Sequence, residues 1–313
     1  MTPVGSRDTS TVIAVDAMSR SAEASSVASG DIDALRFLRR RKVLVLPLAI
    51  LAAFVGVGVL APYLAPQSPT ATDLGLKLTP PAWLADGVAE RPLGSDQLGR
   101  DILSRIIHGT RISLITSLLG IVLAGALGTA LGVIAGYCRG WVDSLIMRVA
   151  DMTLAIHIYI LAIVLAVVWG PGLRNVLVVI VFLLWSRYAR QARAEVLVLR
   201  ERDFVTAARA LGCPGLWIMA RHLLPNIEPS LIVLSTLQVG FVIVLEATLS
   251  FLGAGIPPPA PSWGVMVADG RALIASAWWV STLPGLAILI VVLSVNLVGD
   301  AIRDLLDPRS RKL

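Results

Sequence analysis

Four stretches of this 313-residue chain each run for more than twenty residues without a charged side chain. They are Val43 to Tyr63, Ile112 to Cys138, Met152 to Leu173 and Ala272 to Gly299. About 20 apolar residues in a helix cross the roughly 30 Å of bilayer hydrocarbon. Only 15% of all residues are charged, against about 25% in soluble domains. The sequence therefore predicts an all-α, polytopic transmembrane protein.

Two further spans are predicted from less uniform segments, which gives a bundle of about six. Pro229 to about Leu252 is long enough but contains Glu246, and an ionisable group in lipid is costly unless it faces protein or water. Asn175 to Ser186 is short enough to suit a re-entrant segment as well. It becomes a span if Arg174 and Arg187 snorkel to opposite interfaces.

The distribution of basic residues orients the predicted spans. The inner segments hold 18 of the 27 lysines and arginines, and these segments are residues 36–42, 139–148, 187–221 and 303–312. The positive-inside rule therefore places both termini in the cytoplasm. The outer cluster of Arg100, Arg105 and Arg111 runs against the rule, beside Asp96 and Asp101. Basic residues this widely spread indicate a membrane lipid environment and no nucleic-acid partner.

The chain is expected to form one membrane domain with short tails. Residues 1–34 are rich in Ser, Ala and Thr and are predicted to be a disordered cytoplasmic tail. Residues 35–111 hold the first span and an extracytoplasmic loop, residues 112–309 hold the membrane core, and residues 310–313 form a C-terminal tail. A cleaved signal peptide is disfavoured, because the first apolar run is longer than a typical signal core.

Cysteine and histidine spacing gives no sign of a metal or disulfide framework. Cys138 and Cys213 are the two cysteines, and they are predicted to be unpaired thiols. The three histidines show no metal-ligand spacing. We expect no metal, no cofactor-binding and no catalytic residues in this chain.

The largest predicted cytoplasmic loop, residues 187–228, contains a helix, a turn and a second helix. A stripe of apolar or small residues follows the spacing of one helix face, and its members are Phe204, Ala207, Ala208 and Leu211. The turn is Gly212-Cys213-Pro214-Gly215, and the second helix, Leu216 to Leu223, runs into Pro225. The hairpin either rests on lipid headgroups or docks on a partner, for which the small Ala207, Ala208 and Ala210 allow close approach.

Part of this loop resembles the EAA loop of ABC importer permeases. That loop reads Glu-Ala-Ala, three residues, Gly, nine residues and then Ile-x-Leu-Pro. The matching positions here are Thr206, Ala207, Ala208, Gly212, Leu224 and Pro225. Thr206 replaces the usual Glu and His222 replaces the usual Ile.

Other segments resemble the second permease subunit of dipeptide and oligopeptide ABC importers, the DppC/OppC type. These segments are Arg91 to Asp101, Glu246 to Gly253, Pro261 to Gly264, Gly299-Asp300 and Asp304 to Arg309. The likeness covers roughly residues 35 to 309. It implies the type I (MetI-like) importer permease fold in the bacterial cytoplasmic membrane.

The resemblance also implies partners and site residues. The partners are a homologous DppB/OppB-type permease, two cytoplasmic ATPases and an extracytoplasmic solute-binding protein. The chain has no GxxxxGK[ST] phosphate loop, so it is expected to be no enzyme, with ATP and Mg²⁺ bound by the ATPases. The coupling residues are expected to be Thr206, Ala207, Ala208, Gly212, Arg221, Leu224 and Pro225. A bulky residue at Gly212 should leave the membrane fold intact and uncouple ATP hydrolysis from transport.

Polar residues inside the predicted spans have two interpretations each. Glu246 either lines the translocation path, pairs with a residue of the partner permease, or makes a structural hydrogen bond near the outer interface. An unchanged transport rate in Glu246→Gln would argue against a pathway role. Gln238 and Asn296 are expected to join helices, and His157 to pack between them. Gly253 to Trp279 carries prolines and three tryptophans, typical of an outer gate, a receptor-facing surface or an interfacial belt.

Short peptides are the expected cargo, and nickel chelates or glutathione are the alternative. An intramembrane enzyme that uses Glu246, Asp151 and His157 is disfavoured, because these groups fall in different segments without motif spacing. A channel is the third class, and the absence of a co-purifying ATPase would favour it.

Overall fold

The structure is a computed structural model that describes the backbone of residues 44–306 and the side chains of residues 44–303. The predicted tails, residues 1–34 and 310–313, lie outside this range. Throughout the described part the elements are helical. The all-α prediction is thereby confirmed.

Ten helices and three short turns make up the described part of the chain. The helices are the first helix (Leu44–Leu64), α2 (Ile102–Cys138), α3 (Gly140–Ala155), α4 (Ile158–Trp169), α5 (Leu173–Leu199), α6 (Asp203–Ala210), α7 (Gly215–Ile218), α8 (Leu224–Phe251), α9 (Trp263–Gly270) and α10 (Trp279–Leu306). The turns are η1 (Leu74–Leu76), η2 (Met219–Leu223) and η3 (Arg271–Leu273). Four of the described helical stretches are long and apolar enough to cross a membrane, namely the first helix, α2, Gly215–Phe251 and Trp279–Arg303.

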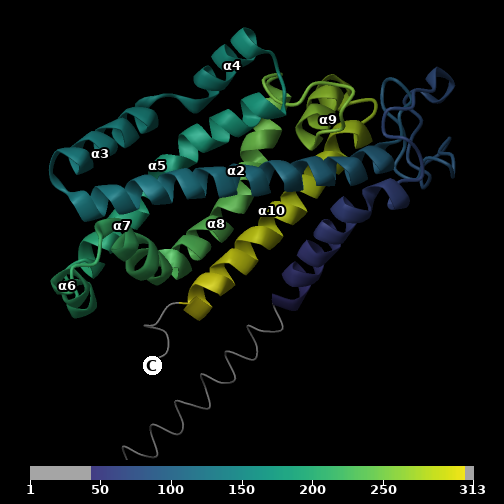
Figure 1. The fold of residues 1–313 in the computed structure, drawn as a ribbon. Helices are drawn as coiled ribbons and strands as arrows, with labels where there is room; N and C mark the ends of the chain where they lie inside the picture. Colours follow the sequence, from purple (N-terminus) through teal and green to yellow (C-terminus); the bar gives the residue numbers. More distant parts are fainter. Residues whose placement is uncertain (1–43, 307–313) are drawn as a thin grey trace, which may run out of the picture. The chain divides into compact units, whose positions relative to one another are not determined.

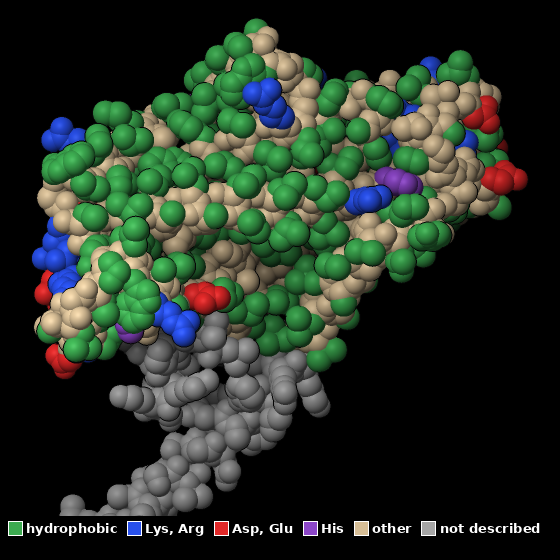
Figure 2. Space-filling view, in the orientation of Figure 1, with side chains coloured by type: hydrophobic (Ala, Val, Ile, Leu, Met, Phe, Trp, Pro, Cys, Tyr) green, Lys and Arg blue, Asp and Glu red, His purple; other side chains and the backbone are tan. Residues whose placement is uncertain are grey.

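The long helices α2, α5, α8 and α10 lie side by side and form the body of the molecule (Figure 1). Helices α6 and α7 lie at one end of this body, here called the hairpin end, and α9 lies at the other. On the face shown in Figure 2, hydrophobic side chains cover the middle, and most charged side chains gather at the two ends. This distribution is typical of a protein whose middle lies in lipid.

The predicted span from Met152 to Leu173 is wrong as a single helix. It is divided between α3 and α4, which are bent by 86° at Ile156 and His157. A bent pair of this kind is either a broken span or a re-entrant segment. His157 is exposed at the break, and is therefore not packed between helices. No proline or glycine lies at the break, so the sequence shows no signal for it.

The predicted short span, Asn175 to Ser186, is the first half of the 27-residue helix α5. This helix continues through Arg187 to Leu199 and packs along α2. At 1.5 Å per residue it is about 40 Å long, which is enough to cross a bilayer. By length and composition, four described helical stretches qualify as spans, and the bent pair α3 and α4 would make five. Adding α5 gives about six.

A row of glycines on α2 brings its backbone close to α5. A methyl group added at Gly128 or Gly132 would overlap the backbone carbonyl oxygen of Trp185 or Ala189. One turn further on, a methyl group at Gly136 would lie 2.9 Å from Val196. Small residues at four-residue spacing are a general device for close helix contact in membranes. They fix α5 against the length of α2.

The charged segment before α2 is buried at the end opposite the hairpin. Asp96, which is 1% exposed, accepts from the Arg100 Nε atom at 2.7 Å and forms a second ion pair with Arg105. Asp101 caps α2, since its carboxylate accepts from the Ser104 N–H at 2.8 Å. Helix α2 therefore begins ten residues before the predicted span. Two of the three arginines that ran against the positive-inside count, Arg100 and Arg105, are thus neutralised within the protein.

Helix α9 packs into the bundle at this same end. Trp263, which is 1% exposed, donates from Nε1 to the Ile106 carbonyl at 3.0 Å, and Trp279 donates to the Ser95 carbonyl at 3.1 Å. Only Trp278 of the three predicted anchors is exposed. Trp263 and Trp279 are core residues, so the belt interpretation is wrong for them.

Asp269 at the end of α9 faces the arginines that precede and begin α2. Its Oδ2 atom lies 3.5 Å from Arg100 Nη2 and 3.8 Å from Arg105 Nη2. Burial raises the pKa of the Asp269 carboxyl, while Arg105 and Arg100 oppose that shift. The contact joins α9 to the segment before α2.

Candidate functional site

The predicted helix-turn-helix is present at the hairpin end. Helix α6 ends in a Schellman motif, in which the Gly212 N–H donates to the Arg209 carbonyl at 2.9 Å and the Cys213 N–H donates to the Ala208 carbonyl at 3.1 Å. Gly212 has a φ of +76°, and open space surrounds the position where a side chain would begin. Glycine is therefore favoured here by backbone conformation, not by crowding.

The buried face of the hairpin differs from the predicted apolar stripe. Val205 and Ala208 are the buried residues of α6, whereas Phe204, Ala207 and Leu211 are exposed. The buried face packs in one hydrophobic cluster with residues of α2, α5 and the start of α8. The cluster's other buried members are Val133, Ala192, Val196, Ile218, Leu223 and Ile227. The hairpin therefore rests on protein through a different face from the one expected.

The outer side of the hairpin exposes large apolar side chains. Leu211 is 83% exposed and Leu216 is 78% exposed, while Trp217 and Phe204 are partly covered. We call these four residues the hairpin tip. The His222 ring lies 4.8 Å from the Trp217 ring and 6.1 Å from the Phe204 ring, measured between centroids. A grouped apolar surface outside the spans is typical of a protein interaction site.

The hairpin is joined firmly to three long helices. Arg200 Nη1 donates to the Tyr137 carbonyl at 2.6 Å, which satisfies an acceptor at the end of α2. The Arg209 guanidinium lies 5.2 Å from the centre of the Tyr137 ring. The second helix of the hairpin also runs without a break into α8, as one stretch from Gly215 to Phe251. The hairpin is therefore attached to α2, α5 and α8.

The predicted end of the second helix at Pro225 is wrong. Pro225 lies in the first turn of α8, directly after the π-helical turn η2. Proline lacks an N–H and its ring clashes with the carbonyl four residues earlier in an α-helix. The wider π turn, in which the Leu224 N–H bonds to the Met219 carbonyl, lets the helix continue past the proline.

The structure places the predicted coupling residues together on the hairpin and the start of α8. Ala208 is buried, and the others are exposed, namely Thr206, Ala207, Gly212, Arg221, Leu224 and Pro225. The Thr206 hydroxyl donates to the Arg202 carbonyl one turn earlier, at 3.4 Å. Their role in coupling stays a prediction.

Glu246 lies in a buried contact between α8 and the start of α9. The side chain is 1% exposed, and its Oε1 atom accepts from the Ser250 hydroxyl at 2.8 Å and the Ser262 hydroxyl at 3.0 Å. Ser262 is the residue before α9, so the carboxyl group links the two helices. Asp151 instead pairs with Arg190 on the surface. Glu246 and Asp151 therefore contact different residues, which gives no indication of a shared catalytic site.

The two predicted interhelical amides have different surroundings. The buried Gln238 on α8 accepts from Arg187 Nη1 of α5 at 3.1 Å, so it joins two helices as expected. Asn296 on α10 is exposed, and its amide group packs closely against Gly240 of α8. Both contacts lie within the body of the bundle.

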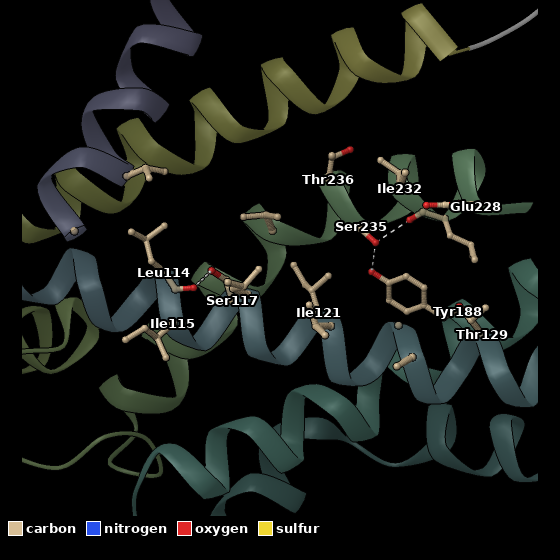
Figure 3. Close-up of a pocket in the computed structure, with 18 of the residues that line it drawn as sticks. Leu114, Ile115, Ser117, Ile121, Thr129, Tyr188, Glu228, Ile232, Ser235 and Thr236 are labelled. Atoms are coloured by element: carbon tan, nitrogen blue, oxygen red, sulfur yellow. Dashed lines mark hydrogen bonds between the residues drawn. The ribbon is translucent and has the colours of Figure 1, made fainter. Parts of the chain in front are cut away.

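A groove of about 980 Å³ lies between the first helix, α2 and α8, with Tyr188 of α5 at its wall (Figure 3). The Tyr188 hydroxyl donates to Ser235 at 2.9 Å, and Ser235 donates to the Leu231 carbonyl at 2.8 Å. Most other lining residues are apolar, and Arg111 and Glu228 are the charged ones. This groove could not be predicted from sequence, because its residues come from four separate segments.

Arg187 is a polar residue of the bundle that sequence reasoning treated only as the end of a span. It lies at the middle of α5, with Gln238 and Phe241 of α8 beside it. The sequence does indicate that the helix continues past Arg187, because Val196 to Leu199 are again apolar. The hydrogen bond with Gln238 depends on the packing of α5 against α8, so no local sequence pattern predicts it.

The bundle and its tethered hairpin define a polytopic membrane protein. Residues 128–312 match the family described as "Binding-protein-dependent transport system inner membrane component". Residues 32–81 match the "N-terminal TM domain of oligopeptide transport permease C". The chain belongs to this family of ABC importer permeases, as the resemblance implied.

Curated relatives agree over most of the chain. A di/tripeptide transport system permease protein DppC of Pseudomonas aeruginosa is 43% identical over 84% of this chain and 86% of its own length. The dipeptide transport system permease protein DppC of Escherichia coli is 41% identical, over 88% and 92%. A probable D,D-dipeptide permease of the same organism is 38% identical. The likeness thus extends well beyond the hairpin.

A solved structure supports the fold. Inward-facing MetNI, a methionine ABC transporter, contains a chain that aligns with a TM-score of 0.53 and 18% sequence identity. The alignment covers 65% of this chain and 96% of that one. The MetI-like permease fold is confirmed.

Proposed function

We propose that this chain is the permease subunit of an ABC importer that carries dipeptides and short oligopeptides into the cell. The hairpin tip carries the coupling part of this proposal, because it exposes apolar side chains on an element fixed to α2, α5 and α8. The cargo rests on relatives at 43% and 41% identity that are named for di/tripeptide and dipeptide transport.

The proposed complex contains four other kinds of component. A homologous DppB/OppB-type permease completes the pathway, and two cytoplasmic ATPases bind ATP and Mg²⁺. An extracytoplasmic solute-binding protein delivers the peptide. The hairpin end and both termini lie in the cytoplasm, as the basic-residue count favours.

Coupling follows from the attachments of the hairpin. ATP binding closes the ATPase pair, and the hairpin moves with the ATPase that holds its tip. Because the hairpin is packed on α2 and α5 and is continuous with α8, its motion tilts these helices. The pathway then alternates between outward and inward access, a change of the hinge or rigid-body kind.

A charge at the tip tests the docking role. Leu211→Glu places a carboxylate on a surface that is 83% exposed here and covered in the proposed complex. We expect at least a tenfold loss of ATPase subunits recovered with the affinity-purified permease, because burying an unpaired charge is costly. Recovery is measured by quantitative immunoblotting of the co-purified complex.

Leu74→Glu is the matched control. Leu74 is 72% exposed in η1, on the segment between the first helix and α2, so the same charge is added to another highly exposed leucine. It should leave ATPase recovery at the wild-type level. Equal recovery for Leu211→Glu and the wild type would refute docking through the tip.

The cargo is tested on the purified complex with its binding protein. Dipeptides and tripeptides should stimulate ATP hydrolysis severalfold at saturating binding protein. Stimulation by nickel chelates or glutathione alone would assign the alternative cargo. The neighbouring genes, which should encode two ATPases, a second permease and a binding protein, supply the components.

A further inference from the structure

The groove between the first helix, α2 and α8 has different side chains at its two ends (Figure 3). Leu114 and Ile115 lie toward one end, and Thr129, Tyr188 and Glu228 lie toward the end nearer the hairpin. We call the second region the hydroxyl end of the groove. Its polar side chains, on the wall of an otherwise apolar groove, are the arrangement that orients a small ligand in a binding site.

Hydroxyl groups at the hydroxyl end accept hydrogen bonds but have no hydrogen left to donate. Each hydroxyl carries one hydrogen. Tyr188 uses its hydrogen on Ser235 at 2.9 Å, and Ser235 uses its own on the Leu231 carbonyl at 2.8 Å. Thr236, which also lines the groove, donates to the Val233 carbonyl at 2.8 Å. A ligand that bonds to these oxygens must therefore supply the N–H or O–H donors.

Glu228 gives the hydroxyl end a negative charge. It lines the groove two turns before Ser235 on α8, about 10 Å away along the helix. Its side chain is exposed, and it forms no ion pair with any Lys or Arg among the side chains of residues 44–303. Arg111, the other charged residue of the groove, lies about 27 Å from Thr129 along α2. The carboxylate is therefore free to attract a cationic ligand.

We infer that the hydroxyl end binds the N-terminal ammonium group of the peptide in transit. An ammonium group brings a positive charge and N–H donors, which match the Glu228 carboxylate and the hydroxyl oxygens. The α-amino group of a peptide is largely protonated at pH 7. Short peptides differ in their side chains but share this group, so one anionic site suits the whole class. This inference rests on the proposed peptide importer function.

Uptake by the reconstituted complex tests the inference. Proteoliposomes that contain all subunits and binding protein are given ATP and either a labelled dipeptide or its N-acetyl derivative, which lacks the ammonium charge. The binding protein is the same in every sample, so the ratio of variant to wild-type uptake for each cargo reports on the permease.

Glu228→Gln should lower uptake of the free dipeptide at least tenfold, because a hydrogen bond between two charged groups is lost. Uptake of the N-acetyl derivative should fall less than twofold. Glu228→Asp, which keeps the charge, should restore dipeptide uptake to within about threefold of the wild type. Recovery of the other subunits with the permease, and peptide-independent ATP hydrolysis, should stay unchanged.

Glu195→Gln is the matched control for the loss of one negative charge. Glu195 lies on α5, two turns beyond Tyr188, and is not among the residues that line the groove. Its carboxylate accepts from Gln191 Nε2 at 2.6 Å, and an amide oxygen at this position can accept the same hydrogen bond. This variant should transport at the wild-type rate.

Three results would overturn the inference. Wild-type dipeptide uptake by Glu228→Gln would show that the carboxylate does not bind the cargo. An equal fractional loss for the dipeptide and its N-acetyl derivative would exclude recognition of the ammonium group. Poor recovery of the second permease or the ATPases would assign Glu228 to a subunit contact. If the wild type itself imports no peptide, the proposed function fails instead, before any variant is compared.

Discussion

At the scale of single residues, Gly212 shows how one backbone conformation supports an entire helical hairpin. Its positive φ lets the chain reverse after α6, and the two hydrogen bonds of the Schellman motif close the turn. The tip residues Leu211 and Leu216 stand on either side of this turn. The orientation of the tip therefore depends on Gly212.

Replacing Gly212 with residues of different backbone preference should separate conformation from size. Gly212→Val strains the left-handed conformation by about 1–2 kcal/mol, so we expect fewer peptides transported per ATP hydrolysed, with the membrane bundle intact. Gly212→Asn, which tolerates this conformation, should stay close to wild type although its side chain is of similar size. The ratio of peptide uptake to ATP hydrolysis measures the effect. Normal coupling in Gly212→Val would argue against a role in docking.

Residue-scale prediction succeeded where the physical reason was local. The turn at Gly212 was predicted correctly, because turn chemistry depends on adjacent residues. The contact of Arg187 with Gln238 was not predicted, because the two residues lie 51 positions apart in sequence. The buried side of α6 was also misjudged, since Val205 faces α2 and α5 only after these helices have packed.

At the scale of elements, the contact between α2 and α5 is the most extensive helix pairing in the described bundle. Glycines at four-residue spacing make it possible, because the α5 backbone occupies the space that side chains of α2 would need. The existence of spans in the first helix, α2 and α10 could be predicted from uncharged runs. The break between α3 and α4 could not, because no helix-breaking residue marks it and the bend depends on packing.

Two glycines on α2 provide a matched test of this contact. A methyl group at Gly132 would overlap the Ala189 carbonyl, whereas at Gly125 its nearest neighbour would be the Tyr188 ring at 3.6 Å. Gly132→Ala should therefore destabilise the bundle by about 1–3 kcal/mol, and Gly125→Ala should be nearly neutral. Thermal unfolding of the purified permease in detergent compares the two. Equal melting temperatures for the two variants would mean that the contact between α2 and α5 accommodates a methyl group at Gly132 without loss of stability.

At the scale of the whole molecule, the two ends of the bundle have distinct contents. One end carries the hairpin tip, and the other carries α9 with the buried Asp96, Arg100 and Arg105 contacts. The helices between them connect both ends directly, since α8 runs from the hairpin to within one loop of α9. Motion at the tip can therefore reach the opposite end through a single helix.

The central claim is that this chain passes peptides only when an ATPase drives it through the hairpin. Uptake of a labelled dipeptide into proteoliposomes tests it most directly, with the complete complex and with Leu211→Glu in its place. We expect the dipeptide to accumulate above its external concentration with ATP, and this accumulation to be lost in Leu211→Glu. Peptide equilibration through this chain alone, without ATP or partner subunits, would identify a channel and contradict the account.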